Sequence, residues 1–141
     1  MDSWFSLAVE TLSAAPADWT PEGIATALRA RLLDDPSGST PYRREMRVVA
    51  DALTDGVRGR AATGGGNWRN ISFAIEPSRR VVTLDLVRRV VGRPEDELDV
   101  LPPQVAGVRR RWRVAGGMLW ARTQLDADVV TELGLDSRSR P

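Results

Sequence analysis

The chain contains no cysteine and no histidine. A disulfide scaffold and a zinc site with Cys or His ligands are therefore impossible, although these are the usual supports of a chain with a small core. The 141 residues must instead fold by burying apolar side chains, which make up 42% of the sequence. A chain of this length suits one domain and can bury a sizeable core.

The same absences restrict the chemistry. Without His or Cys the chain lacks the commonest general base, the commonest metal ligand and a cysteine nucleophile. Lys is absent as well, so a phosphate-binding loop of the Walker type cannot form. Acidic residues at 95–99 and 126–132 do not match a calcium loop, and the first set suits the first turn of a helix. We therefore expect a protein that is not an enzyme, with no catalytic residue, cofactor or metal ligand.

Three N-terminal segments carry helical patterns. Residues 3–14 place apolar side chains on one face after Ser3, which is a suitable N-cap. Residues 20–33 open with Thr-Pro-Glu, a strong helix start, and then repeat apolar residues at a spacing of four. Residues 40–53 open with a second Thr-Pro pair. The apolar positions of this third predicted helix are Tyr42, Met46, Val49 and Leu53.

The rest of the chain reads as further short elements. Residues 71–91 fit a β-hairpin, two helices, or short strands that lead into a helix, and periodicity does not choose among them. Helices are expected at 94–99, 105–114 and 125–135, with Gly116-Gly117 as a turn or break. The sequence thus predicts a mainly α fold, a bundle of five to seven helices in a single domain over residues 1–135. One short β-hairpin near 71–86 is compatible with it, and residues 136–141 are expected to be a disordered tail.

Residues 58–70, RGRAATGGGNWRN, are the most informative stretch for function. Three glycines populate many backbone conformations, so a flexible connector is one interpretation. A second interpretation makes Asn67 the N-cap of a short helix, because Arg and Asn are the side chains that pair with guanine and adenine edges. The candidate nucleic-acid ligands here are Arg58, Arg60, Asn67, Arg69, Asn70 and Ser72.

Four segments occur in a characteristic order within about residues 20–115. They are TPEGIATALRARL, SGSTPYRREM, ISFAIEPSRRVVTLDLVRRVVG and VRRRWRVAG. This order resembles that of bacterial helix-turn-helix domains related to phage repressors. The resemblance implies a recognition helix that carries Asn67, Arg69, Asn70 and Ser72. It also implies duplex DNA as the partner.

A second basic cluster, RRRWR, contributes Arg109, Arg110, Arg111 and Arg113 as candidate contacts to a phosphate backbone. Alternatively, these arginines form an exposed face that pairs with the acidic residues of EDELD. Trp68 and Trp120 lie beside glycines, and an exposed tryptophan at either position would mark a surface for a protein partner.

These features predict a non-enzymatic binding module. The first expectation is a helix-turn-helix-like regulator that binds duplex DNA, and the alternative is a helical adaptor or assembly subunit that binds a protein partner. A homo-oligomer is compatible with both. We expect no membrane association, since no run of eighteen apolar residues occurs, and a cytoplasmic location, since the acidic start of the chain is unlike a signal peptide.

Overall fold

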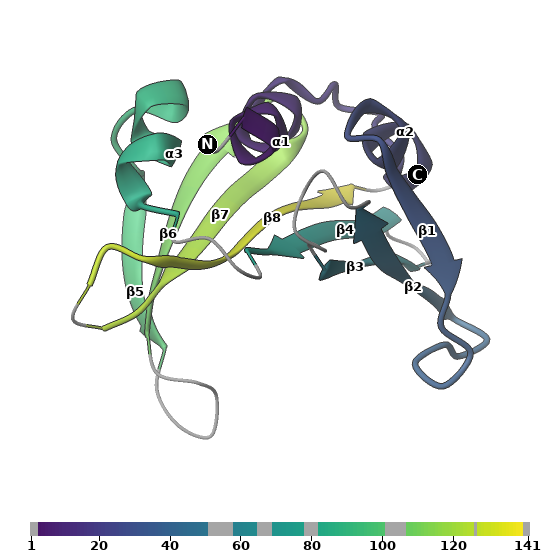
Figure 1. Cartoon of the computed structure of the whole chain (residues 1–141). Coiled ribbons are helices and arrows are strands. Elements are labelled where there is room, and N and C mark those ends of the chain that lie inside the picture. Colours follow the sequence, from purple (N-terminus) through teal and green to yellow (C-terminus); the bar gives the residue numbers. More distant parts are fainter. Residues whose placement is uncertain are drawn as a thin grey trace.

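A computed structural model of the chain describes residues 3–50, 58–64, 69–77, 82–100, 107–125 and 127–139 (Figure 1). These residues form one antiparallel sheet of eight strands with three helices. The helices are α1 (Ser3–Ala14), α2 (Pro21–Ala27) and α3 (Leu84–Val91). The strands are β1 (Ala30–Asp34), β2 (Arg43–Ala50), β3 (Arg58–Gly64), β4 (Arg69–Glu76), β5 (Asp96–Val100), β6 (Gly107–Val114), β7 (Gly117–Thr123) and β8 (Val130–Ser139).

The strand order is β1-β2-β3-β4-β8-β7-β6-β5. The sheet therefore consists of two four-stranded meanders, β1 to β4 and β5 to β8, whose last strands pair with each other in the middle. The register of this central pair sets Phe73 against Leu135 and Ser72 against Asp136. Between the meanders the chain runs through α3 to the far edge of the sheet and then returns strand by strand to its centre.

The three helices lie on one face of the sheet and bury it (Figure 1). Side chains alternate between the two faces of a strand, so β4 directs Ile71, Phe73 and Ile75 toward the helices. Leu12 of α1 and Val87 of α3 belong to the same buried cluster. The opposite face of the sheet is not covered by any helix of the described residues.

The predicted helical bundle is wrong, because most of the described chain is strand. A helix-turn-helix arrangement is wrong for the same reason. The proposed recognition helix falls on β4, which begins at Arg69, while Asn67 and Trp68 lie outside the described residues.

Four predicted helices are strands in the structure. The segment 40–53 contains β2, in which Met46, Val48 and Ala50 alternate toward the core, while Tyr42 is 83% exposed. The segments 94–99, 105–114 and 125–135 contain β5, β6 and part of β8. β8 continues to Ser139, beyond the expected domain end at residue 135. In β2 and β8 a period of two buries apolar side chains against the helix layer, whereas β5 is an edge strand whose Leu98 is exposed.

Other local predictions are confirmed. The helix at 3–14 is α1, and Thr20 caps α2 by accepting a hydrogen bond from the Gly23 amide at 3.1 Å. That helix ends at Ala27, and residues 30–34 form β1 instead of its last turns. Of the three alternatives for residues 71–91, the structure has the strand that precedes a helix, β4 followed by α3. Gly117 opens β7 after the expected turn.

None of the helices in the described residues combines the length and the apolar character that crossing a bilayer requires.

Candidate binding site on the uncovered face of the sheet

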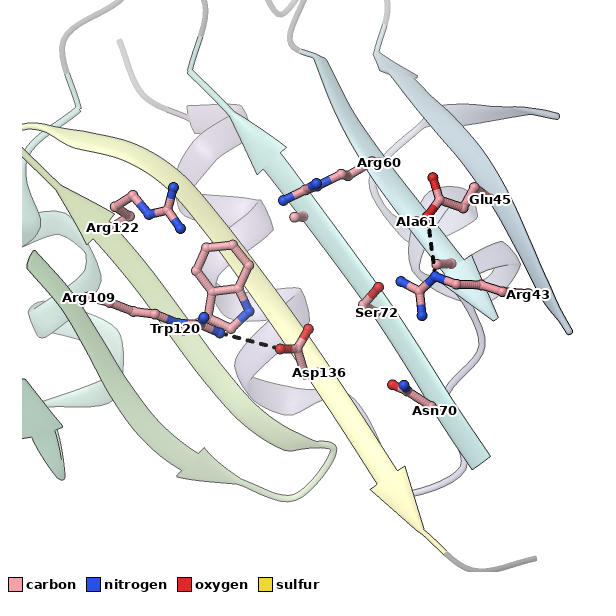
Figure 2. A pocket seen from close by; sticks show the side chains of 12 residues that line it. Arg43, Glu45, Arg60, Ala61, Asn70, Ser72, Arg109, Trp120, Arg122 and Asp136 are labelled. Carbon is pink, nitrogen blue, oxygen red and sulfur yellow. Dashed lines mark hydrogen bonds and ion pairs between the residues drawn. The ribbon is translucent and has the colours of Figure 1, made fainter. Parts of the chain in front are cut away.

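The uncovered face of the sheet holds a hollow of about 250 Å³ (Figure 2). Its floor lies on the central strands, where Ala62, Ser72 and Ala74 are small. Its walls are long polar side chains from the strands on either side. The residues that line it are Arg43, Glu45, Arg60, Ala61, Ala62, Asn70, Ser72, Ala74, Arg109, Trp120, Arg122 and Asp136.

Trp120 of β7 forms one wall of the hollow and lies over Gly134 of β8, to which it is paired. A Cβ atom at position 134 would collide with the indole ring, so glycine is required beneath this side chain. The Arg109 guanidinium lies on the ring, 4.4 Å from its centroid. Trp120 is thus enclosed between backbone and guanidinium and is only 5% exposed. The expectation of an exposed Trp120 does not match this burial.

Among the described side chains, three N–H groups beside the hollow are buried and have no hydrogen-bond acceptor. They are Trp120 Nε1, Arg109 Nε and Arg122 Nε. A buried donor without an acceptor costs about 1–3 kcal/mol. The other tryptophans of the described residues differ, because the Nε1 groups of Trp4, Trp19 and Trp112 each donate to a backbone carbonyl at 2.8–3.0 Å.

Arginines outnumber acids around the hollow. Four arginines and two acids line it, which leaves a formal excess of two positive charges. Arg43 pairs with Glu45 at 3.2 Å, and Arg109 pairs with Asp136 at 3.4 Å. Arg122 makes no ion pair with any other described residue. Burial lowers the pKa of the Arg109 guanidinium, an effect that the Asp136 carboxylate opposes.

A third acid, Glu132 of β8, lies close to the site. Its side chain is 8% exposed, and Oε2 lies 3.6 Å from Nη2 of Arg60. Burial raises the pKa of Glu132 above its ordinary value, while the positive charges of Arg60 and Arg122 act in the opposite direction.

A second hollow of about 470 Å³ adjoins the first on the same face. Arg109 and Asp136 line both, so this ion pair forms the wall between them. The other lining residues are Leu98, Arg111, Arg113, Gly117 and Met118.

The structure brings together five residues that the sequence had assigned to separate surfaces. Those that line the first hollow are Arg60, Asn70, Ser72, Arg109 and Trp120. The strand pattern carries Arg58 to the same face, where it is exposed but does not line the hollow. Arg69 lies in β4.

The arginines of RRRWR are divided between the two faces of β6. Arg111 and Arg113 line the second hollow. Arg111 pairs with Asp96, and Nε of Arg113 lies 3.8 Å from Oε1 of Glu95. Arg110 is on the other face, where it donates to Glu97 and to Thr123 Oγ1. The EDELD residues therefore do pair with this cluster, as the alternative interpretation expected.

Sequence reasoning missed Arg43, Glu45, Arg122, Gly134 and Asp136. Arg43 and Asp136 fall in or beyond segments that were expected to be helical, and their alternation with apolar residues was the available signal. Among the described residues, no group of three or more acidic side chains is placed to hold a metal ion. Within the described part of the chain, Ser72 is the one hydroxyl that lines the first hollow, and the sequence has no imidazole to activate it.

Comparisons of the chain with known proteins give no match. No protein-family model matches it, and no curated protein or solved structure is significantly similar to it. The geometry of the uncovered face is therefore the basis for the function.

Proposed function

We propose that the chain is a non-enzymatic binding module whose uncovered sheet face binds a protein partner. The observation that carries this proposal is the hollow around Trp120, where three buried N–H donors lack acceptors. Unsatisfied donors of this kind are expensive in a folded protein, and an acceptor supplied by a partner removes the cost.

A protein partner suits this face better than a nucleic acid. A nucleic acid needs an extended positive surface, and a single strand also uses exposed aromatic rings on which its bases stack. Here the ring of Trp120 is covered by Arg109, and several arginines are already paired with acids. Tryptophan and arginine, which meet in this hollow, are enriched among the residues that dominate binding at protein interfaces.

We assign no catalytic role to this face, because its acids are already paired. Asp136 and Glu45, the acids that line the first hollow, are each paired with an arginine. Each of these carboxylates is thus held by a guanidinium group. The chain also has no cysteine that could act as a nucleophile.

A photo-reactive benzoylphenylalanine at position 72 tests the proposal in cells. The matched control carries the same group at Arg31, an exposed residue of the edge strand β1. We expect one protein to cross-link from position 72 and not from position 31. That protein, once purified, should bind the wild-type chain in solution and bind the Arg122→Ala variant more weakly.

Two results would contradict the proposal. One is equal cross-linking of the same proteins from positions 72 and 31, which indicates chance contact. The other is that the purified candidate does not bind, while single-stranded or duplex DNA does bind at about 150 mM salt, where weak non-specific association is largely screened.

A further inference from the structure

We propose that the first hollow takes a carboxylate side chain from an extended acidic segment of the partner. This inference rests on the proposed function and specifies the chemistry of the segment that is bound. It starts from the size of the hollow, about 250 Å³, which lies below the usual range of about 300–1,000 Å³ for pockets that enclose a drug-sized molecule. A single side chain suits this space.

The charges select an anion. Arg60 enters from β3 on one side of the hollow, and Arg109 and Arg122 enter from β6 and β7 on the other (Figure 2). The small side chains of the central strands leave the space between these arginines open. A guanidinium presents parallel N–H groups that match the two oxygens of a carboxylate. Arg122 is the cation best placed for this role, since it makes no ion pair with a described residue, although it lies opposite Glu132 in the register of β7 and β8.

The indole adds a directional donor. Trp120 is 95% buried, lines the hollow and has an Nε1–H group without an acceptor. Arg109 lies on the ring and is held to Asp136 by a contact of 3.4 Å, which is long for a charge-assisted hydrogen bond. An incoming carboxylate can therefore draw Arg109 from Asp136 and accept from the indole at the same time.

The second hollow indicates that the bound segment is extended. It begins on the other side of the Arg109–Asp136 pair and contains the apolar side chains of Leu98 and Met118. Leu98 is 47% exposed although it is a large apolar residue. A segment that crosses the shared wall places its acid in the first hollow and an apolar side chain against Leu98 and Met118.

Fluorescence anisotropy with labelled synthetic peptides tests the inference. The probe is a peptide of about ten residues that contains glutamates and one leucine, and the matched peptide has glutamine in place of every glutamate. With the wild-type chain we expect the glutamine peptide to bind about 10- to 100-fold more weakly, the range expected when charge-assisted hydrogen bonds are lost. Replacing the leucine with serine should weaken binding by a smaller factor.

Variants of the chain locate the site. Arg122→Ala, or Arg122→Met if the alanine variant unfolds, should weaken the glutamate peptide by about tenfold or more. Trp120→Phe keeps an aromatic ring and removes the N–H donor, so it should also weaken binding. The matched control is Arg58→Ala, because Arg58 lies two residues from Arg60 on the same face but outside both hollows. This control should change the affinity by less than about twofold.

Three results would overturn the inference. They are equal binding of the glutamate and glutamine peptides, an Arg58→Ala effect as large as that of Arg122→Ala, and full displacement of the peptide by millimolar free glutamate or inorganic phosphate. The last result would mean that the site takes small anions instead of a segment. If none of the peptides binds while the partner cross-linked from position 72 does, the proposed function stands and the acidic segment is refuted.

Discussion

Trp120 can lie against the sheet only because residue 134 has no side chain. Any Cβ atom at Gly134 would overlap the indole ring, and the ring in turn supports the guanidinium of Arg109. Two neighbouring strands therefore share a single steric requirement. The hollow depends on the glycine at position 134, because a Trp120 ring displaced from it would move into the space above the small floor residues.

Gly134→Ala should lower the free energy of unfolding by about 1–3 kcal/mol, the usual cost of forcing extra atoms into a packed site. Urea denaturation measures this change. The control is the same substitution made in a Trp120→Ala background, where the ring is absent and the cost should largely disappear. An equal cost in both backgrounds would show that the ring does not occupy the position over residue 134.

Glu132 makes the stability of the folded protein depend on pH. Its pKa is raised in the folded state, so folding favours the protonated acid. The stability that this group contributes is complete below the ordinary pKa of 4.5 and is lost as pH rises through the higher pKa of the folded state. Glutamine at position 132 removes the ionisation that causes this loss.

Glu132→Gln should therefore raise the Tm at pH 7 to 8 and have little effect at pH 4, where the native acid is neutral. Thermal unfolding at a series of pH values measures the difference. Glu10→Gln, at an exposed position of α1, is the control and should shift the Tm little at any pH. A Glu132→Gln variant that is less stable than the native chain at pH 7 would mean that the contact with Arg60 outweighs the burial of the charge.

Helix capping makes a prediction at the scale of single elements. Thr20 and Thr83 both occupy N-cap positions, at α2 and α3, but only the Thr20 hydroxyl accepts a backbone hydrogen bond. Thr20→Ala should cost about 0.5–2 kcal/mol, as the loss of an N-cap usually does. Thr83→Ala is the matched control and should cost less. Equal losses in urea melts would attribute the Thr20 effect to packing and not to the cap.

Elements with a local cause were predictable from the sequence. The cap and proline that start α2, the alternation in β4 and the glycine after α3 all act within a few residues. β2 and β6 were not predictable in this way, because their apolar residues fit both a helical and an alternating pattern. Burial against helices from elsewhere in the chain decides between the two patterns, and that information is not local.

The candidate site shows the same division. Arg60, Arg109 and Trp120 could be selected as residues suited to binding by their chemical type alone. Their meeting in one hollow depends on the pairing of β4 with β8 and on the register of that pair. A shift of one residue in that pair would leave Arg60 on the opposite face of the sheet from Arg109 and Trp120. No feature of the sequence reveals the strand order, so the site could not be assembled in advance.

At the scale of the whole molecule, β8 joins the two halves of the sheet. It pairs with β4 on one side and β7 on the other, and it supplies Leu133 and Leu135 to the core. A chain that ends at residue 125 should therefore lose its cooperative urea transition. Adding a synthetic peptide of residues 127–139 should restore the transition. A truncated chain that still melts cooperatively at an unchanged midpoint would show that the first meander folds without its central neighbour.

The central position of β8 also affects the nascent protein. The first meander leaves the ribosome before β8 has been made, and the outer edge of β4 then has no strand to pair with. Open edges of this kind attract strands from other molecules, which is a common origin of aggregation. During translation the edge of β4 that later pairs with β8 is thus exposed for a time and open to other strands. A chaperone that shields extended segments would be most useful to the protein at that stage.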